Sequence, residues 1–224
     1  MESVEINDVL VFDTETTGIP AKGLEWDKDF EKFPRVVQLA WHYKGDLKSY
    51  IIKPEGWEIP DDTVEVHGIS TEHALKYGVP FEKAVTEFLN DANEAPLICA
   101  HNIYFDVSIL KADILRNMGR EYYDTQADGA LYKGKRIDTM TATRKYVGAR
   151  FADGRPGKFP RLEELYAKLF DGATFPAHDA GEDVKALTAC LPPLVEMGLI
   201  KLEQKVYDAP KESEPATETK QRCK

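Results

Sequence analysis

The sequence predicts an α/β fold in which helices flank a central mixed sheet of about five strands. Two observations support this prediction. Three strand-like runs occur within residues 9–52, and helix and strand patterns alternate from residue 80 onward. Strand-like runs joined by a short turn favour antiparallel pairing, whereas strands separated by helices favour parallel pairing. We therefore expect three antiparallel strands first, followed by strands that join the sheet in parallel.

The first expected strand, residues 9–12, is a short apolar run that ends in acidic and hydroxyl residues before the turn signal Gly18-Ile19-Pro20. The second and third strands, residues 36–43 and 49–52, flank the turn signal Lys44-Gly45-Asp46. The acidic residues should therefore lie at the C-terminal end of the first strand, where they are well placed for chemistry.

After Pro80, apolar residues recur at the spacing of an amphipathic helix. The recurring residues are Phe81, Ala84, Val85, Phe88, Leu89 and Ala92. A buried strand is expected at residues 96–100, and a helix at residues 105–118 that ends at Gly119.

Shorter elements are expected in the second half of the chain. They are a strand at 136–138, helices at 139–147, 161–170 and 180–191, and a loop at 148–160. Pro192 and Pro193 should end or kink the last helix, because proline lacks an amide donor and clashes with the preceding turn.

The chain is expected to form one domain, residues 1–206, followed by a disordered polar tail, residues 207–224. The domain is long enough for a large core, and 42% of the 224 residues are hydrophobic. The tail is rich in Lys, Glu, Thr and Pro and has almost no apolar residues.

The sequence also predicts a soluble, cytoplasmic protein. Its 3 cysteines are too few and too scattered for a disulfide framework or a zinc ribbon. No basic and apolar leader is present at the start, and no apolar run approaches the roughly 20 residues of a membrane span.

The net charge of −10 argues against a protein that coats nucleic acid, but the charge is uneven. Residues 133–161 carry 9 basic and 2 acidic side chains, which leaves −17 on the rest of the chain. Such a run is often only a solvated surface. Beside a phosphodiester-cleaving site, its loop residues could instead hold phosphates upstream of the cleavage point. Those residues are Arg150, Arg155, Lys158 and Arg161.

Three short motifs carry the candidate chemistry. The first, DTETTG at residues 13–18, places Asp13 and Glu15 two residues apart at a strand end, so both point to one face. Paired carboxylates repel one another unless a cation lies between them, and oxygen ligands select hard ions such as Mg²⁺ or Mn²⁺. Two ordinary surface acids are the alternative.

The second motif, HNIYFD at residues 101–106, places Asp106 in the first turn of a helix, where the helix dipole alone favours an acid. The third, HDAGED at residues 178–183, places His178 before a helix and Asp183 one turn later. Each of these two motifs is weak evidence when taken alone.

Together, in this order and at these spacings, the motifs resemble the DEDDh (DnaQ-like) branch of 3′-5′ exonucleases. This family includes the proofreading subunit of bacterial DNA polymerase III, RNase T and oligoribonuclease. Two further segments, residues 35–40 and 66–70, also look like the family, and the resemblance spans about residues 8–200. It implies a ribonuclease H-like fold and an exonuclease domain at 1–206.

The resemblance also implies the roles of five residues and a requirement for two metal ions, Mg²⁺ or Mn²⁺. Asp13, Glu15 and Asp183 would hold one ion. Asp13 and, through water, Asp106 would hold a second about 3.5 to 4 Å away. His178 would be the general base, because an imidazole with a pKa of about 6.5 accepts a proton near neutral pH.

The substrate implied by the resemblance is a nucleic acid with a free 3′ end. The residues expected to receive its terminal nucleotide are Thr16, Thr17, Gly18, His67, Asn102 and Phe105. Phe105 could stack on a base or belong to the core, and His67 could be a loop histidine held by backbone.

Single-stranded DNA is the expected substrate. An exoribonuclease of the same fold is the alternative, because the motifs do not separate the two sugars. A silent nucleic-acid-binding module is a third possibility, although all four carboxylates and the histidine are present. A hydrolase of small phosphoesters would need a closed pocket. A polymerase or other repair partner is possible, and the oligomeric state is left open.

Overall fold

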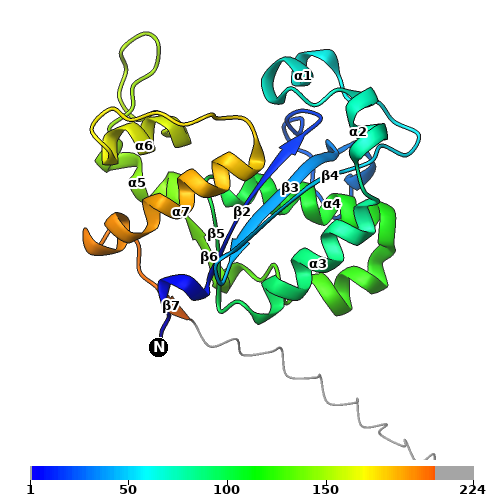
Figure 1. Ribbon diagram of the computed structural model, residues 1–224, viewed down its shortest axis with the longest axis horizontal. Coiled ribbons are helices and arrows are strands. Elements are labelled where there is room, and N and C mark those ends of the chain that lie inside the picture. Colours follow the sequence, from blue (N-terminus) through cyan, green and yellow to red (C-terminus); the bar gives the residue numbers. More distant parts are fainter. Residues whose placement is uncertain (1, 205–224) are drawn as a thin grey trace, which may run out of the picture.

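The computed structural model of the chain describes residues 2–204, and the predicted tail lies outside these residues. A five-stranded sheet forms the centre of the molecule, with strand order β4-β3-β2-β5-β6 (Figure 1). Its strands are β2 (Val9–Thr16), β3 (Val36–Tyr43), β4 (Asp46–Ile51), β5 (Leu97–Ala100) and β6 (Arg136–Asp138).

The pairing within the sheet is mixed, as predicted. Strands β2, β3 and β4 pair antiparallel, whereas β5 pairs parallel to β2 and β6 pairs parallel to β5. A separate pair of short antiparallel strands, β1 (Glu2–Ser3) and β7 (Glu203–Gln204), joins the two ends of the described chain.

Helices cover both faces of the sheet (Figure 1). One face packs on α3 (Phe81–Glu94) and α4 (Ile103–Tyr122), and the six residues predicted to form the apolar face of α3 are all buried. The other face packs on α5 (Thr139–Val147), α6 (Leu162–Leu169) and α7 (Ala180–Glu196).

Successive side chains of β2 point alternately into the two cores on either face of the sheet. Leu10 and Phe12 belong to the core under α3 and α4, whereas Val9 and Val11 belong to the core under α6 and α7. Successive side chains of a strand point to opposite faces, so the residues that follow inherit the same alternation.

Two short helices were not predicted: α1 (Asp61–His67) and α2 (Thr71–Tyr77). Each has 7 residues, too few to show a clear apolar period. Gly68, with a φ of 75°, ends α1, and the Ser70 hydroxyl caps α2 by accepting a hydrogen bond from the His73 amide at 3.1 Å.

Several predicted boundaries differ from the structure. Strand β2 continues to Thr16 because it keeps pairing with β3, and β4 begins at Asp46 for the same reason. Helix α4 begins at Ile103. At Gly119 a φ of 83° interrupts the helical backbone, but the chain resumes a helical path to Tyr122.

The prolines were predicted to end or kink the last helix, and they do not end it, because α7 passes through Pro192 and Pro193 to Glu196. Each proline removes one amide donor. Leu191 and Leu194 on either side are nevertheless buried, and this packing holds the last turn against the core.

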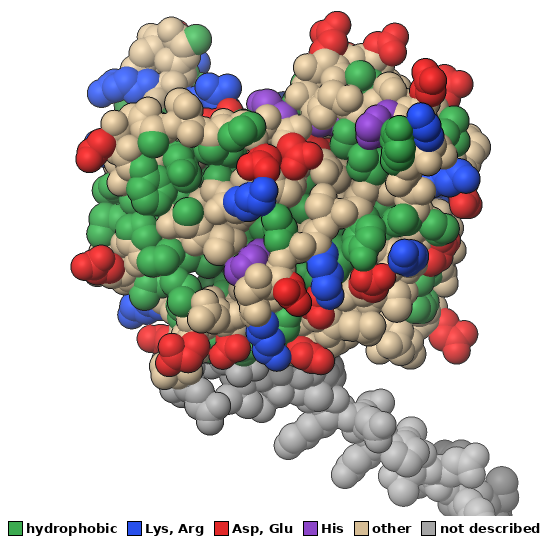
Figure 2. Space-filling model, in the orientation of Figure 1, with side chains coloured by type: hydrophobic (Ala, Val, Ile, Leu, Met, Phe, Trp, Pro, Cys, Tyr) green, Lys and Arg blue, Asp and Glu red, His purple; other side chains and the backbone are tan. Residues whose placement is uncertain are grey.

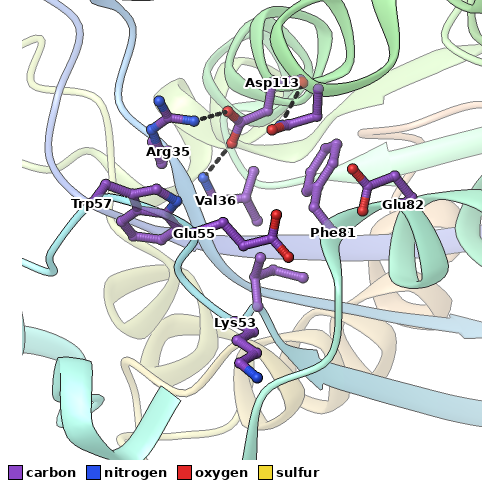
Figure 3. A pocket seen from close by; sticks show the side chains of 10 residues that line it. Arg35, Val36, Lys53, Glu55, Trp57, Phe81, Glu82 and Asp113 are labelled. Atoms are coloured by element: carbon purple, nitrogen blue, oxygen red, sulfur yellow. Dashed lines mark hydrogen bonds and ion pairs between the residues drawn. The ribbon is translucent and has the colours of Figure 1, made fainter. Parts of the chain in front are cut away.

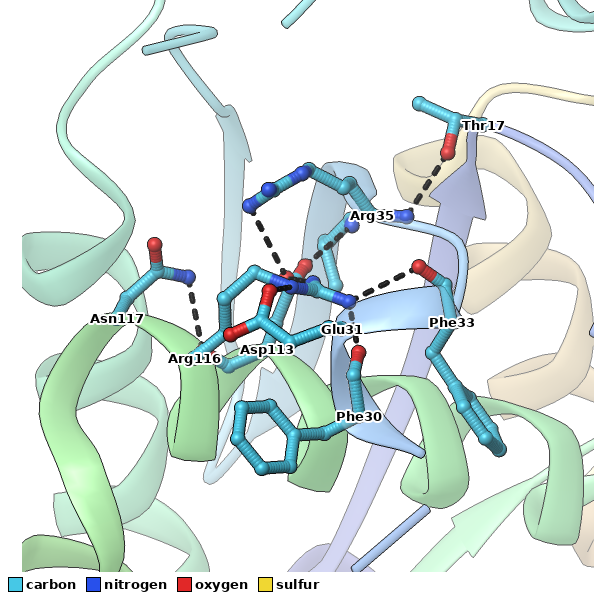
Figure 4. A network of polar contacts seen from close by, with 9 residues as sticks. Thr17, Phe30, Glu31, Phe33, Arg35, Asp113, Arg116 and Asn117 are labelled. Carbon is cyan, nitrogen blue, oxygen red and sulfur yellow. Dashed lines mark hydrogen bonds and ion pairs between the residues drawn. The ribbon is translucent and has the colours of Figure 1, made fainter. Parts of the chain in front are cut away.

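A buried ion pair fastens the loop before β3 to helix α4 (Figure 4). The Asp113 carboxylate accepts a hydrogen bond from the Val36 amide at 2.7 Å and contacts the Arg116 guanidinium. Arg116 in turn donates to the carbonyl oxygens of Phe30 and Phe33. The Asp113 charge is thus paired with a cation and hydrogen-bonded, as a buried charge requires.

Candidate active site

The candidate active site lies at the carboxyl end of β2 (Figure 1). Asp13 and Glu15 continue the face of Val9 and Val11, on the side of α7. Thr14 points to the opposite face, where its groups bond to Asp106 on α4. The strand end is therefore shared by side chains from both layers of helices.

The strand bends directly after these carboxylates. Glu15 pairs with Gln38, but Thr16 pairs with Val36, so the register shifts by one residue. Such bulges redirect a strand and the side chains beside it.

The third motif, residues 178–183, lies at the start of α7 and reaches the carboxyl end of β2. The Asp179 side chain caps this helix by accepting from the Glu182 amide at 3.1 Å. Gln38 on β3 binds the Asp179 carboxylate at 3.1 Å and accepts from the Ala180 amide at 3.2 Å. These bonds dock the helix on the sheet and place Asp183 over β2.

Three carboxylates converge where β2 meets α7. One oxygen from each of Asp13, Glu15 and Asp183 lies within 4.8 Å of the others. Burial and mutual repulsion raise the pKa of Asp13 well above its usual value and that of Glu15 to about 8. Burial raises the pKa of Asp183 to about 6.

This cluster fits a divalent cation. A hard ion prefers carboxylate oxygens, and its charge would offset the repulsion that raises these pKa values. Within the described part of the chain, Asp13, Glu15 and Asp183 form a group of at least three acidic, His or Cys side chains whose ligand atoms are close enough together to hold a metal ion.

Asp106 stands apart from the three-carboxylate group. Its Oδ1 atom accepts hydrogen bonds from the Thr14 amide at 3.1 Å and the Thr14 hydroxyl at 2.7 Å. Burial raises the pKa of Asp106 to about 7, although the bonds from Thr14 oppose that rise. Asp106 also contributes to the raised pKa of both Asp13 and Glu15, which places it within electrostatic range of them.

His178 lies at the rim of the site with its side chain 51% exposed. Its backbone amide donates to Asp183 Oδ2 at 2.9 Å, and its Nε2 atom lies 3.9 Å from Glu163 Oε1. A φ of 69° turns the backbone sharply just before α7. Glu163 was not predicted as a site residue, since only the packing of α6 on α7 brings it near His178.

His101 forms a second wall of the site. Its Nε2 atom lies 2.9 Å from the carbonyl oxygen of Pro160, which can only accept, so Nε2 carries the hydrogen. Nδ1 then accepts from the Thr139 hydroxyl, 3.0 Å away. Burial lowers the pKa of His101, so the neutral ring braces the segment that leads into α6.

These residues surround an open cavity of about 210 Å³. Its lining residues are Asp13, Thr14, Glu15, His101, Phe105, Asp106, Leu162, Glu163, His178 and Asp183. All five residues predicted to be catalytic are among them.

Two further cavities adjoin the first, and Phe105 lines all three. One, of about 460 Å³, is lined in part by Thr16, Gly18 and His67. The other, of about 330 Å³, is lined in part by Asn102. Phe105 therefore lies between the cavities, and it also packs, partly buried, against the core under α3 and α4.

Thr17 is the predicted substrate residue that the structure does not bring to these cavities. Its hydroxyl accepts from the Arg35 amide at 2.8 Å, and its own amide donates to the Arg35 carbonyl at 2.9 Å. Thr17 fastens the turn after β2 to the start of β3.

His67, at the end of α1, is buried with one ring nitrogen unpaired. Its Nδ1 atom accepts from the Ile69 amide at 3.1 Å, whereas Nε2 has no hydrogen-bond partner among the described residues. Burial lowers the pKa of His67. A buried unpaired donor beside a cavity is costly unless a ligand satisfies it.

A smaller hollow lies on the other side of Arg35 (Figure 3). Its volume is about 20 Å³, which is room for a single water molecule. The Arg35 guanidinium lies 5.7 Å from the centre of the Trp57 ring and 3.9 Å from Asp113. This hollow is too small for a nucleotide.

An α/β sheet with converging carboxylates at the end of its central strand, in an open cleft, is an arrangement that suits metal-assisted phosphoryl transfer. The model of the RNase_T family, described as Exonuclease, matches residues 10–191. The chain belongs to this exonuclease family, and the resemblance to its DEDDh branch is confirmed.

Solved structures share the fold. Exonuclease I from Methylocaldum szegediense is 21% identical with a TM-score of 0.63, covering 84% of this chain and 40% of its own. E. coli exonuclease I in complex with a dA16 oligonucleotide is 22% identical with a TM-score of 0.60, over 84% and 40%. The nuclease domain of 3′hExo, a DEDDh family member bound to rAMP, is 12% identical with a TM-score of 0.60, over 88% and 96%.

The chain thus spans less than half of the exonuclease I structures and nearly all of the 3′hExo nuclease domain. A search of curated proteins gave no match. Within residues 2–204, no helix is both long enough and apolar enough to cross a membrane.

Proposed function

We propose that the protein removes nucleotides from the 3′ end of single-stranded DNA, with two divalent ions held at the end of β2. The main support for this proposal is that carboxylate oxygens of Asp13, Glu15 and Asp183 lie within 4.8 Å of one another. Asp106 and His178 line the same open cavity. Membership of the exonuclease family supports this reaction.

The carboxylates would hold Mg²⁺ or Mn²⁺, which when bound would stabilise the charge that develops on the attacking and leaving oxygens. Asp13, Glu15 and Asp183 supply one set of ligands, and Asp13 with Asp106 supplies the second. Asp106 is oriented for this role by its two hydrogen bonds from Thr14.

His178 would take the proton from the attacking water as general base. Its exposed ring lies at the cavity rim, where water has free access. The hydrogen bond from the His178 backbone amide to Asp183 holds the backbone in place. Glu163 would attract the imidazolium that forms after proton transfer.

The terminal nucleotide would occupy the cavities on either side of Phe105. That ring can stack on a base without sequence preference. His67 offers its unpaired Nε2 atom to the sugar or the base, and Thr16, Gly18 and Asn102 line the remaining walls.

Single-stranded DNA is the proposed substrate because E. coli exonuclease I, which shares the fold, was solved with a dA16 oligonucleotide. The 3′hExo domain was solved with rAMP, so RNA is the alternative to test. A cytoplasmic location and a polymerase or repair partner stay predictions of the sequence alone.

The test is degradation of matched 5′-labelled DNA and RNA oligomers with Mg²⁺, with Mn²⁺ and with EDTA. We expect a ladder that shortens from the 3′ end with either metal and is absent in EDTA and in Asp13→Asn. His178→Ala should slow cleavage by roughly 10² to 10⁴-fold while metal binding persists. A ladder from Asp13→Asn at the wild-type rate would refute the site.

A further inference from the structure

A hairpin formed by residues 148–160 projects from the molecule between α5 and α6 (Figure 1). Arg150 and Pro156 pair across it as an antiparallel bridge, and the Phe151 amide donates to the Arg155 carbonyl at 2.9 Å. Gly154, with a φ of 82°, makes the turn at its tip. The hairpin therefore has a defined conformation.

Both helices beside the hairpin hold its base. The Arg144 guanidinium on α5 donates to the Gly157 carbonyl and lies 4.1 Å from the centre of the Phe159 ring. Lys158 forms an ion pair with Glu164 on α6, at 2.9 Å. Arg144 and Lys158 are thus occupied in fixing the hairpin to the molecule.

The hairpin rises directly from the wall of the catalytic cavity. Pro160, its last residue, contacts His101 through its carbonyl oxygen, and both Leu162 and Glu163 line the cavity. A strand that extends from this cavity past α6 would run alongside the hairpin.

The tip carries an exposed aromatic ring beside the Arg155 guanidinium, and Arg150 precedes it in the sequence. Phe151 is 45% exposed, and the Arg155 guanidinium lies 5.4 Å from the centre of its ring. The Arg155 side chain is 75% exposed and binds Asp153 through Nε, while Arg150 binds the Gly154 carbonyl through Nη1. Each guanidinium has five donors, so others remain to bind phosphate.

Two other basic residues of the stretch 133–161 have structural roles. Lys135 donates to the Ala92 carbonyl at 2.9 Å and Arg136 to the Leu131 carbonyl at 3.1 Å, so both serve the fold. In Figure 2, Lys and Arg side chains flank the projection at the upper left. On an acidic chain, such a basic tip beside the cavity favours a polyanion.

We propose that the hairpin tip binds the nucleic acid strand upstream of the cleavage point. Arg150 and Arg155 contact its phosphates, and Phe151 stacks on an unpaired base. This inference rests on the proposed function, since it assumes that the 3′ end occupies the cavity.

The tip at Gly154 is separated by about six residues from Pro160 at the cavity wall. At about 3.3 Å per residue, the tip therefore lies up to roughly 20 Å from that wall. Stacked nucleotides rise about 3.4 Å each, so the contact falls roughly six nucleotides upstream. A trinucleotide fills the cavity without touching the tip, whereas an oligomer of about 15 nucleotides reaches it.

The experiment compares these two lengths with the full chain. Binding of 5′-fluorescein-labelled DNA is measured by anisotropy in EDTA at about 50 to 200 mM salt, and hydrolysis of the trinucleotide is measured with Mg²⁺. The variants are Arg150→Gln with Arg155→Gln, and Phe151→Ala. The charge-matched control is Lys83→Gln with Lys201→Gln, at two exposed lysines on α3 and after α7.

The double arginine variant should bind the long oligomer about tenfold more weakly at low salt, with a salt slope smaller by about 1.4. Phe151→Ala should weaken binding about fivefold or more. Trinucleotide hydrolysis and the lysine control should match the wild type. Equal long-oligomer affinity and slope in all variants would overturn the hairpin role, even with full hydrolysis. Wild-type binding without hydrolysis would instead count against the proposed function alone.

Discussion

Thr14 and Asp106 lie 92 residues apart in sequence, yet two hydrogen bonds join them, at 3.1 Å from the Thr14 amide and 2.7 Å from its hydroxyl. Thr14 lies between Asp13 and Glu15 but points to the opposite face of β2. The residue that separates the paired carboxylates thus positions Asp106, the carboxylate of the second motif, from the other layer of helices.

The first prediction tests this positioning. Thr14→Val keeps the hydrogen bond from the backbone amide but removes the hydroxyl donor. The buried Asp106 carboxylate then has one hydrogen-bond donor fewer. We expect cleavage to fall roughly 10 to 100-fold, as for residues that orient metal ligands. The free energy of unfolding should fall by about 1 to 3 kcal/mol. Steady-state kinetics and urea unfolding measure the two effects.

Thr14→Ser is the matched control, because it retains the hydroxyl and loses one methyl group. Its cleavage rate should stay close to that of the wild type. If Val and Ser at this position gave equal rates, the hydroxyl would have no part in holding Asp106.

The second prediction concerns repulsion within the carboxylate cluster. Asp13→Asn removes one of the converging charges, so the metal-free protein should become more stable at pH 8. The melting temperature should rise by roughly 2 to 4 °C, the shift that about 1 kcal/mol produces in a domain of this size. Calorimetry in EDTA measures it. A fall in melting temperature would show that Asp13 makes a favourable contact when no metal is bound.

The third prediction is the pH dependence of the metal-free protein. The pKa values of Glu15, Asp106 and Asp183 in the folded chain are about 8, 7 and 6, above the usual carboxyl value. The folded state therefore binds protons more tightly than the unfolded state. Their contribution to stability is complete below about pH 4 and is lost as the pH rises through 6 to 8.

In EDTA, the melting temperature should therefore fall between about pH 5.5 and 8.5. Mg²⁺ should restore it, and most strongly at the alkaline end, where all the carboxylates are ionised. The same scan on Asp13→Asn should show a shallower fall. A melting temperature that rises over this range in EDTA would contradict the cause assigned to these pKa values.

The sheet and the motif residues were predictable because their signals are local. Alternation along β2 places Asp13 and Glu15 on one face whatever the rest of the chain does. The strand pattern at residues 136–138 and the helical pattern after Pro80 likewise arise from neighbouring residues, and both match the structure.

The remaining site residues depend on tertiary contacts that leave no local pattern. Glu163 meets His178 only because α6 packs on α7. Thr17 turns toward Arg35 because β2 bulges after Glu15. His67 is buried because it ends α1, a helix too short to predict. Packing around Leu191 and Leu194 likewise overrides the helix-breaking tendency of the two prolines in α7.

The fourth prediction concerns the ion pair beneath the turn that carries Thr17 (Figure 4). The side chains of Asp113 and Arg116 are 3% and 5% exposed. Arg116→Met would leave the carboxylate buried without its cation, although burial already raises the pKa of Asp113 to about 6. We expect a loss of about 3 to 5 kcal/mol in the free energy of unfolding, measured by urea denaturation at pH 7.5.

The double variant Asp113→Asn with Arg116→Met separates the loss of the pair from the loss of packing. An Asn side chain can still accept from the Val36 amide through its carbonyl oxygen, and both charges of the buried pair are removed together. The double variant should therefore be more stable than Arg116→Met alone. If it were the less stable of the two, Asp113 would contribute through another partner, and Arg35, 3.9 Å away, would be the first to substitute.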